Sequence, residues 1–282
     1  MEKKFKAVIC AIAKKENTYI NDWVNWHINI GFEHIYLFDN NDSKEDFVGN
    51  FIDRMDSVTI YDVRDRREES LQSRCYNKFY RENKEKFDWC LFIDIDEFLS
   101  GVSGIKKFLC DEKFDNFDQI RITWKTFSDS SLLKRDISVP VYDSFKDLSK
   151  NKELNKQAKP LIRGGLSTIS ISPHRGVLVD YKNNKVENLK SCLSSGTSCK
   201  TNGIMKECVL DDLENETVFI NHYRTKSLKE FIDQKLNRGD ACSLGKTIDF
   251  DYYWISNDRT EEKEKFIREY LMSIGDKIDG QQ

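Results

Sequence analysis

Three carboxylates follow one apolar run in this chain. The run from Trp89 to Ile93 is typical of a strand buried on both faces, and Asp94, Asp96 and Glu97 come directly after it. Asp94 and Asp96 lie two residues apart, so in an extended segment they point to the same side. Carboxylate oxygens, completed by water and substrate phosphates, are ligands that Mg²⁺ and Mn²⁺ prefer. The spacing therefore predicts metal-assisted chemistry on a phosphorylated substrate, and the alternative is an acidic turn or a helix cap.

The composition limits the class of protein. The chain has 282 residues, enough for one large α/β domain or two small ones. Its 45 basic and 48 acidic residues nearly cancel to a net charge of −3, so no general attraction to nucleic acid is expected. The eight cysteines are scattered and lack the CxxC spacing of a zinc site, so we expect free thiols in a reducing cytoplasm.

The sequence contains no run that is apolar enough to span a bilayer. The apolar stretch from Phe5 to Ala13 is shorter than a spanning helix and contains Lys6, and no export signal is evident. We therefore expect a soluble cytoplasmic protein without a transmembrane segment. Peripheral contact with the inner face of the membrane stays open.

Strands and helices are expected to alternate in the first half of the chain. Before the run that ends at Ile93, apolar runs predict strands and helical periodicity predicts helices, in turn, over residues 7–13, 19–30, 34–38, 44–55, 58–63 and 71–84. This order predicts an α/β fold, a Rossmann-like and mostly parallel sheet flanked by helices, with ligand groups on the loops after the strands. The motifs GxGxxG and GxxxxGK[ST] are absent from the sequence, which argues against ordinary dinucleotide-binding and P-loop enzymes.

The second half is predicted to be α+β, followed by C-terminal helices. Strands are expected over four ranges, of which the last two pair with each other: 119–123, 139–145, 167–172 and 177–181. Five lysines between Asp143 and Pro160 predict a solvated, mobile connection. A short strand near residue 218 is expected to lead into a helix over 228–238, and a final helix over 259–274 is expected to pack on the domain.

Ordered motifs along the chain resemble those of a known family. They are Lys15-Glu16, Asn21-Asp22-Trp23, Trp26-His27, the segment from Gly31 to Asn41, Asp94-Ile95-Asp96-Glu97-Phe98, and the segment from His222 to Ser227. They resemble the GT-A glycosyltransferases, in particular the family-2-like and family-92-like group, over most of residues 6–240. The resemblance implies a GT-A catalytic domain over 1–240, with a nucleotide-binding half over 1–118 and an acceptor-binding half over 119–240. Residues 241–282 would form a helical extension packed on this domain.

The resemblance also implies a metal site. The Asp-x-Asp pair and a divalent metal, Mn²⁺ or Mg²⁺, would hold the diphosphate of a nucleotide-sugar donor. Asp94 and Asp96 would contact the metal and the ribose or phosphate, and His222 would complete the metal shell, since neutral imidazole is acceptable to Mn²⁺. The alternative role for His222 is a cap or a hydrogen bond in the core.

Residues after the first two strands are expected to contact the nucleoside. By the resemblance these residues are Ala13, Lys15 and Glu16 after the first strand, and Asp39 and Asn41 after the second. Short polar side chains there can contact the edges of uracil and ribose. For Asp39 and Asn41 the alternative is a plain Asx turn.

Further donor contacts are expected from two other places in the chain. Arg74 and Asn77 lie about one turn apart on the predicted helix over 71–84, from which they would reach the donor sugar or phosphate. An exposed helix face explains this pair nearly as well. Three basic residues later in the chain would stabilise the charge of a departing nucleoside diphosphate: Lys226, Lys235 and Arg238.

An inverting transfer needs a general base near the acceptor hydroxyl, preferably an Asp or Glu. The segment from Trp124 to Ser131 resembles a family loop W-x-x-F-G-S-S, with Ser128 in place of the glycine, and makes Asp129 the candidate base. Its rivals are Asp180 and Asp240.

Histidines and one basic segment have weaker patterns. The residues from Lys159 to Arg163 resemble a family K-x-I-x-R segment, which together with His174 is expected to shape the acceptor pocket. His27 lies on a predicted helical stripe and His34 begins a predicted strand, so both are expected to be structural.

These features predict a metal-dependent, inverting glycosyltransferase that moves a hexose from a UDP-sugar to a glycan or glycolipid acceptor in surface polysaccharide or lipopolysaccharide synthesis. A processive synthase is disfavoured because the residues from Gln234 to Gly239 lack the tryptophan of a Gln-x-x-Arg-Trp motif. Two other classes stay open. They are a nucleotidyltransferase or phosphatase with a carboxylate metal site, and a non-catalytic nucleotide- or glycan-binding module.

Overall fold

The computed structural model describes residues 5–64, 66, 68–200, 210–236, 238 and 247–279. The interpretations of Gly239 as the end of a motif and of Asp240 as a rival base fall outside these residues.

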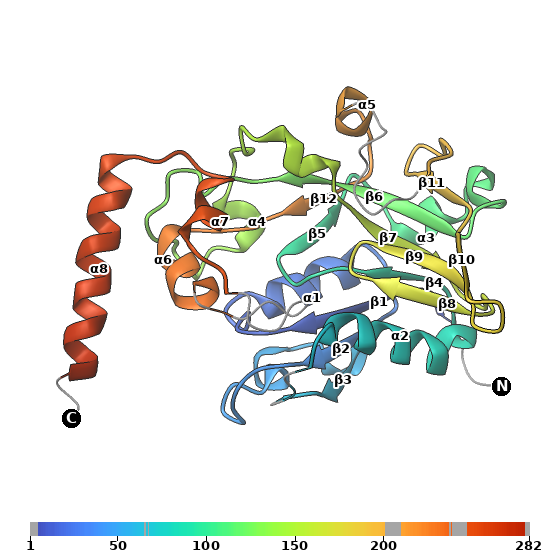
Figure 1. The fold of residues 1–282 in the computed structure, drawn as a ribbon, viewed down its shortest axis with the longest axis horizontal. Coiled ribbons are helices and arrows are strands. Elements are labelled where there is room, and N and C mark those ends of the chain that lie inside the picture. The colour runs from blue at the N-terminus through green and yellow to red at the C-terminus, as the bar shows by residue number, and fades with distance from the viewer. Residues whose placement is uncertain are drawn as a thin grey trace.

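One curled sheet forms the centre of the fold (Figure 1). Its strand order is β3 (Val58–Asp62), β2 (His34–Asp39), β1 (Phe5–Ala13), β4 (Phe87–Phe92), β7 (Ala158–Arg163), β6 (Gln119–Thr126), β12 (Phe219–His222) and β5 (Glu97–Ser100), with β11 (Ser191–Leu193) paired to β6. β3, β2, β1 and β4 are parallel neighbours, as are β6 and β12. β7 runs antiparallel to β4 and β6, and β5 runs antiparallel to β12. The predicted α/β class with a mostly parallel sheet is confirmed.

Helices cover both faces of the parallel half of the sheet. Ala7 and Ile9 of β1 belong to the same apolar cluster as Trp23 of helix α1 (Ile20–Asn29). Val8 of β1, between them, belongs to a second cluster with Phe79 of helix α2 (Leu71–Asn83). Successive strand residues point to opposite faces, so a strand between two helical layers must be apolar throughout. This is why the apolar runs located these strands.

The remaining elements surround this layered core. The second, antiparallel sheet consists of β8 (Ile169–Ser172), β9 (Arg175–Asp180) and β10 (Lys185–Asn188), which confirms the predicted pairing of 167–172 with 177–181. The short helices are α3 (Ile105–Leu109), α4 (Val141–Ser144), α5 (Leu210–Glu214), α6 (Leu228–Glu230) and α7 (Phe250–Trp254). The 3₁₀ turns are η1 (Val48–Phe51), η2 (Met55–Ser57), η3 (Lys84–Lys86), η4 (Glu112–Phe114) and η5 (Lys152–Lys156). The π-helical turn η6 (Phe231–Lys235) follows α6 directly, and helix α8 (Glu261–Asp279) stands at one end of the molecule (Figure 1).

Two predicted elements are wrong. Residues 44–55 form the turns η1 and η2 instead of one helix, because side chains take the backbone groups that a helix would pair: the Asp39 carboxylate accepts from the Val48 N–H at 3.0 Å and Asn41 donates to the Asp46 carbonyl at 2.9 Å. Residues 139–145 contain helix α4 instead of a strand. Val141 in its first turn is buried in the core, and the backbone becomes extended again at Phe145, which is also buried.

The lysine-rich stretch before Pro160 is also more ordered than predicted. It contains the turn η5 and ends inside β7, at the middle of the sheet. Lys159 is fully buried there. The expected mobile connection is therefore wrong at its C-terminal end, because an apolar run with one lysine forms a central strand.

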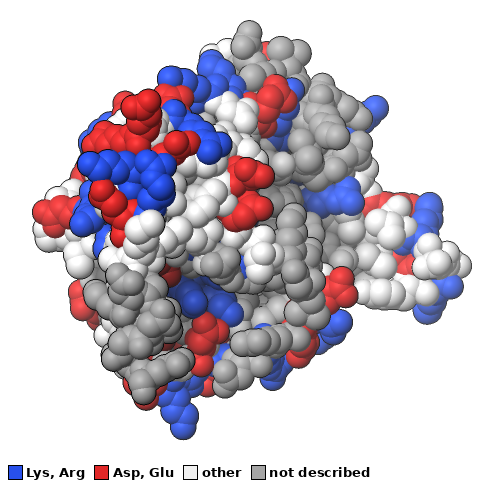
Figure 2. Space-filling view, turned by 60° about the vertical axis from the view of Figure 1, so that its left-hand side comes forward, with Lys and Arg blue, Asp and Glu red and all other residues white. Residues whose placement is uncertain are grey.

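Five of the described cysteines carry free thiols: Cys10, Cys75, Cys90, Cys110 and Cys192. Within the described ranges, no helix has the length and apolar character needed to cross a membrane. On the face that Figure 2 shows, basic and acidic side chains are interspersed.

Candidate functional site

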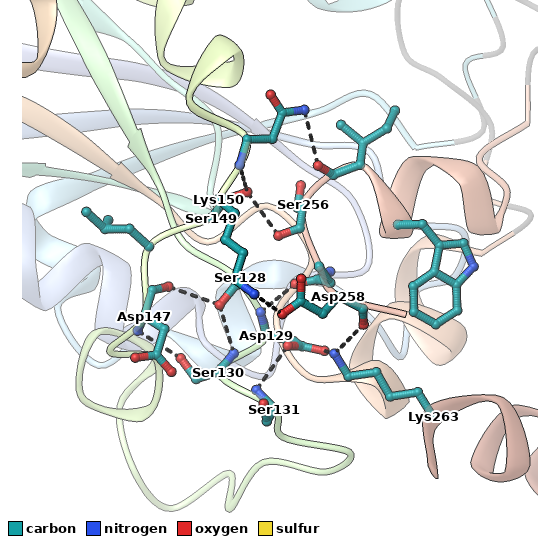
Figure 3. A pocket seen from close by; sticks show the side chains of 15 residues that line it. Ser128, Asp129, Ser130, Ser131, Asp147, Ser149, Lys150, Ser256, Asp258 and Lys263 are labelled. Carbon is teal, nitrogen blue, oxygen red and sulfur yellow. Dashed lines mark hydrogen bonds and ion pairs between the residues drawn. The ribbon is translucent and has the colours of Figure 1, made fainter. Parts of the chain in front are cut away.

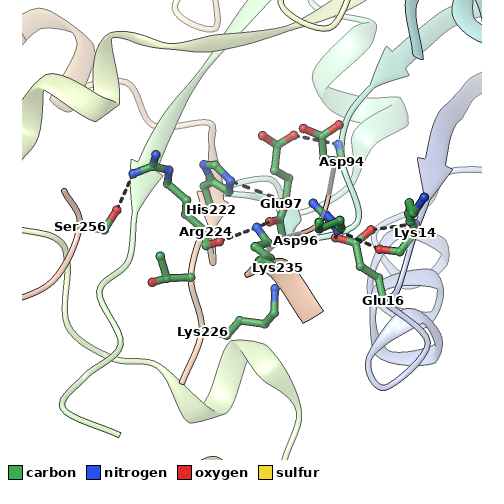
Figure 4. Close-up of polar contacts among 12 residues, drawn as sticks. Lys14, Glu16, Asp94, Asp96, Glu97, His222, Arg224, Lys226, Lys235 and Ser256 are labelled. Atoms are coloured by element: carbon green, nitrogen blue, oxygen red, sulfur yellow. Dashed lines mark hydrogen bonds and ion pairs between the residues drawn. The ribbon is translucent and has the colours of Figure 1, made fainter. Parts of the chain in front are cut away.

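The Asp-x-Asp pair forms a tight turn at the carboxyl end of β4. The Glu97 N–H donates to the Asp94 carbonyl at 3.2 Å, and the Glu97 carboxylate accepts from the Asp94 N–H at 2.9 Å. Ile95, between the two aspartates, is fully buried. The turn therefore anchors its middle residue in the core and sends Asp94 and Asp96 toward the opposite side. Figure 4 shows Asp96 close to His222 and Lys235, which come from distant parts of the chain.

Asp94 is bound by two side chains that the sequence patterns did not identify as its partners. The Lys159 ammonium of β7 lies 2.6 Å from Oδ2, and the Gln72 amide of α2 donates to Oδ1 at 2.6 Å. Burial by itself raises the pKa of Asp94, but the Lys159 ammonium outweighs it, so the pKa lies below its ordinary value. Lys159 also lies 3.4 Å from the Glu97 carboxylate. A lysine inside an apolar run was the available signal for this buried cation.

Asp96 has a different set of partners. The Lys235 ammonium lies 2.5 Å from Oδ2, and Nε2 of His222 lies 3.6 Å from Oδ1. Burial by itself raises the pKa of Asp96, but the Lys235 ammonium, together with His222 and Lys226, lowers it well below its ordinary value. Burial lowers the pKa of His222, so its imidazole is neutral near pH 7. The structure thus brings Asp96, His222 and Lys235 together, and their roles toward a metal or a diphosphate stay predictions.

A row of polar residues crosses the sheet beside the two aspartates. Glu97 of β5 pairs in register with His222 of β12, which in turn pairs with Thr126 of β6. Each of these residues has a buried side-chain atom without a hydrogen-bond partner: Oε1 of Glu97, Nδ1 of His222 and Oγ1 of Thr126. Burial raises the pKa of Glu97 well above its ordinary value. Unpaired buried polar atoms are costly, so such a row is typical of a site that takes up a ligand or water.

Further cations surround Asp96. The Lys226 ammonium donates to the Tyr19 hydroxyl at 3.0 Å, and burial lowers the pKa of Lys226 to about 8. The Arg238 guanidinium donates to the Lys14 carbonyl at 2.8 Å and lies 3.7 Å from Glu16. Burial raises the pKa of Glu16, and Arg238 opposes that effect. Lys226 and Arg238 therefore lie near the Asp-x-Asp pair, whereas Glu16 adds an opposing carboxylate.

The expected nucleoside contacts lie at the ends of β1 and β2. Ala13 ends β1, and Lys15 adopts a left-handed backbone with φ of 57° and donates its N–H to Asn41 at 2.7 Å. The Asp39 carboxylate accepts from the N–H groups of Asn41 and Val48, both at 3.0 Å. The Asx turn is therefore present. Contact of these residues with a nucleoside stays a prediction.

Arg74 and Asn77 have other neighbours. The Arg74 side chain is 67% exposed and contacts Glu68 at 3.9 Å. The Asn77 amide donates to the carbonyl of Ile171 and accepts from the N–H of Ile171, which ties α2 to β8. Gln72, on the same helix, is the residue that reaches Asp94.

Asp129 lies in a separate pocket of about 310 Å³, between the loop after β6 and the C-terminal segment (Figure 3). Its Oδ2 atom binds the Lys263 ammonium at 2.6 Å and accepts from the Tyr253 hydroxyl, and its Oδ1 atom accepts from the Ser131 N–H at 3.0 Å. The side chain of Asn257 accepts from the Asp129 N–H at 2.6 Å. Asp129 therefore ties the C-terminal segment to the sheet, and a role as base stays a prediction.

The remaining predicted residues are placed as follows. Both ring nitrogens of His27 are bonded, to the Trp23 carbonyl and the Leu99 N–H, which confirms a structural role. His34 contacts the Thr59 hydroxyl at 2.8 Å, between β2 and β3. His174 packs against Trp124, with ring centroids 5.6 Å apart. Asp180 caps an exposed turn after β9.

The residues of this site can be tested for a divalent metal. Among the described residues, no group of three or more His, Cys, Asp and Glu side chains is arranged to hold a metal ion. Asp96 and His222 are an adjacent oxygen and nitrogen pair, and Mg²⁺ and Mn²⁺ use one or two protein ligands together with water and phosphate. The donor set thus fits a metal whose coordination shell a phosphorylated ligand completes.

Comparison with known proteins gives only distant similarity. No protein family and no curated protein matches the sequence. Among solved structures, the fold is similar to HddC from Yersinia pseudotuberculosis, with a TM-score of 0.35 and 10% identity over 66% of this chain and 89% of that chain. It is also similar to a putative glucose-1-phosphate thymidylyltransferase from Bacillus anthracis in complex with a sucrose, with a TM-score of 0.31 and 12% identity over 56% of this chain and 69% of that chain.

Proposed function

We propose that this protein is a glycosyltransferase that transfers a hexose from a nucleoside-diphosphate sugar, UDP-hexose, to a glycan or glycolipid acceptor. The observation that carries the proposal is the pair Asp94 and Asp96 at the end of a central strand, with Lys159 and Lys235 bound to them. A diphosphate needs cations around it, and the carboxyl end of a parallel sheet is where α/β proteins bind nucleotides. The GT-A family itself stays a prediction from the motifs.

We propose Mn²⁺ or Mg²⁺ as the cofactor, with Asp96 and His222 as its protein ligands and Asp94 beside them. When bound, the metal would neutralise the charge that develops on the departing nucleoside diphosphate. Lys226 and Arg238 would stabilise the same charge directly, since both lie near Asp96. Glu16 and the loop after β2 would bind the nucleoside.

Asp129 is our candidate for the general base. In that role it would have to give up its contacts with Lys263 and Tyr253 when the acceptor arrives. Asp129→Asn would then lower turnover by about 10²–10⁴-fold and leave UDP affinity unchanged. An unchanged turnover would restrict Asp129 to its structural contacts.

A nucleotidyltransferase is the second candidate, because the same carboxylates and lysines would bind a nucleoside triphosphate equally well. The two activities differ in product. A nucleotidyltransferase releases pyrophosphate from a nucleoside triphosphate, whereas a glycosyltransferase releases a nucleoside diphosphate from a nucleotide sugar. Chromatography of products from the two kinds of substrate separates them.

The first test is calorimetric titration of UDP into the purified protein with Mn²⁺ and with EDTA. We expect metal-dependent binding that is lost when Asp94→Ala and Asp96→Ala are combined. The control is Asp136→Ala, which removes a carboxylate from an exposed turn. Binding that is indifferent to both the metal and the aspartates would contradict the proposal.

A further inference from the structure

The C-terminal segment from Asp249 to Asp258 contacts the turn that follows β12, at Arg224 and Thr225. The Tyr252 ring lies 3.6 Å from the guanidinium carbon of Arg224, measured to the ring centroid. The Ser256 hydroxyl accepts from the same guanidinium at 2.8 Å (Figure 4). Asn257 donates to the Thr225 hydroxyl at 3.0 Å. Successive residues of the turn are thus held by one segment that lies beyond the predicted catalytic range of 1–240.

The turn that is held has a strained backbone. Lys226, which is 1% exposed, adopts a left-handed conformation with φ of 58°. A residue other than glycine in this region costs on the order of 1–3 kcal/mol and persists only where its surroundings fix it. On one side these surroundings include a capping box in which Ser227 and Glu230 bond each other's backbone. On the other side they are the contacts from Ser256 and Asn257.

The same turn sets the cations beside Asp96. The Arg224 carbonyl accepts from the Lys235 ammonium at 2.5 Å, and that ammonium binds Asp96 at 2.5 Å. Tyr252 also lies near Lys235, whose ammonium is 5.9 Å from the ring centroid. A shift of Arg224 would therefore move the carbonyl that fixes Lys235, and would relax the backbone that points Lys226 inward.

The segment from Asp249 to Asp258 is itself held in place by contacts of Tyr253 and by a helix cap at Asp249. The Tyr253 hydroxyl donates to Asp129, and the Tyr253 ring packs on Phe231 with centroids 5.0 Å apart. Asp249 caps the start of α7 by accepting from the Tyr252 N–H at 3.2 Å. Tyr252 therefore lies on a helix that is fixed at both of these points. Its ring packs on the Arg224 guanidinium, close to the ion pair of Lys235 and Asp96.

We propose that the segment from Asp249 to Asp258 is part of the anion-binding site, with Tyr252 as a positioning residue that holds Arg224, Lys226 and Lys235 in place to bind a diphosphate. This inference rests on the proposed diphosphate site at Asp94 and Asp96. It gives the C-terminal segment a role in ligand binding beyond packing.

The test is titration of inorganic pyrophosphate with excess Mg²⁺ into the parent protein and four variants. Tyr252→Leu should weaken pyrophosphate binding by about tenfold, the scale of one desolvated cation–π contact. Tyr252→Phe keeps the ring and should restore affinity to within about twofold of the parent protein. The matched control is Tyr181→Leu, which removes a ring that is 76% exposed after β9 and should leave affinity unchanged.

The fourth variant distinguishes a local effect on Arg224 from a loss of folding. Ser256→Ala removes one hydroxyl from the Arg224 guanidinium and should weaken pyrophosphate binding by several-fold, with far-UV circular dichroism unchanged. Equal affinity of the parent, Tyr252→Leu and Ser256→Ala proteins would overturn the inference, as would a parent protein that does not bind pyrophosphate. Pyrophosphate binding without UDP binding would contradict the proposed donor and leave this inference standing.

Discussion

Two buried aspartate–lysine pairs lie in different surroundings in this protein. Asp96 binds Lys235 at 2.5 Å, and Asp129 binds Lys263 at 2.6 Å. The four side chains are 3–5% exposed, so the two pairs are nearly identical as isolated ion pairs. The two pairs differ in the charged and polar groups that surround them.

The partners of Asp129 in this structure belong to the fold itself, and the proposed role as base requires Lys263 and Tyr253 to release it. A hydroxyl, a backbone N–H and the ammonium take both carboxylate oxygens, and the contacts with Tyr253 and Lys263 join the C-terminal segment to the loop after β6. Around Asp96, by contrast, Lys226 adds charge and His222 keeps a buried nitrogen without a partner. The comparison teaches that a buried ion pair does not by itself indicate a binding site. The indication comes from further charged or unpaired polar groups beside the pair that make no contact needed to hold the fold together.

The largest expected effect tests the Asp96 pair. Asp96→Asn keeps the shape of the side chain and removes the charge, so it should lower the release of UDP from a UDP-hexose by about 10²-fold or more, because it removes a metal ligand. The measurement is the initial rate of UDP formation with Mn²⁺. A rate equal to that of the parent protein would rule out the assignment of Asp96.

The next largest effect tests the Asp129 pair through stability. Asp129→Ala leaves the buried Lys263 ammonium unpaired and should lower the free energy of unfolding by about 3–5 kcal/mol, measured by urea denaturation. The matched control lies in the same pocket. Asp258→Ala removes the partner of Lys150 from a pair whose side chains are 82% and 61% exposed, and should leave the free energy of unfolding nearly unchanged because solvent screens the pair. Equal losses in the two variants would contradict the comparison.

A smaller effect should appear in the pH dependence of UDP binding. A lysine carries its charge below its pKa, which burial lowers to about 8 for Lys226. UDP affinity should therefore hold up to about pH 7 and fall by about tenfold toward pH 9, as one cation near the diphosphate is lost. Lys226→Met should bind more weakly and show a flat profile over this range. A parent profile that is itself flat would show that Lys226 does not face the ligand.

The smallest expected effect concerns Asp94. Gln72→Ala removes one hydrogen bond to Asp94 but leaves Lys159 in place, so the free energy of unfolding should fall by only about 1 kcal/mol. The control is Lys78→Ala on the exposed face of the same helix, which should be neutral. A loss as large as that expected for Asp129→Ala would mean that Gln72, and not Lys159, chiefly fixes Asp94.

The parallel half of the fold could be predicted because its strands lie between two layers of helices. Burial on both faces makes such strands apolar throughout, and this pattern is visible in β1, β2 and β4. Residues 44–55 could not be predicted in the same way, because the carboxylate of Asp39 and the amide of Asn41 hold that backbone. A side chain that caps a distant backbone group leaves no periodic pattern.

The candidate site was predictable in part for a related reason. The position of Asp94 and Asp96 after an apolar run located the centre, and the structure places His222 beside Asp96. Lys159 was missed as a partner of Asp94 because the lysine-rich residues before it resemble a solvated loop. Its burial follows from the place of β7 between β4 and β6.

The sequence by itself determined the strands of the parallel half, their burial and the type of chemistry available at the end of β4, because these depend on residues that are close together in the chain. Only the tertiary structure decided which charges meet there. Lys159 reaches Asp94 across 65 residues, and Lys235 reaches Asp96 across 139. Such contacts depend on strand order and on the path of the C-terminal segment, which are set by the packing of the whole core rather than by any local pattern.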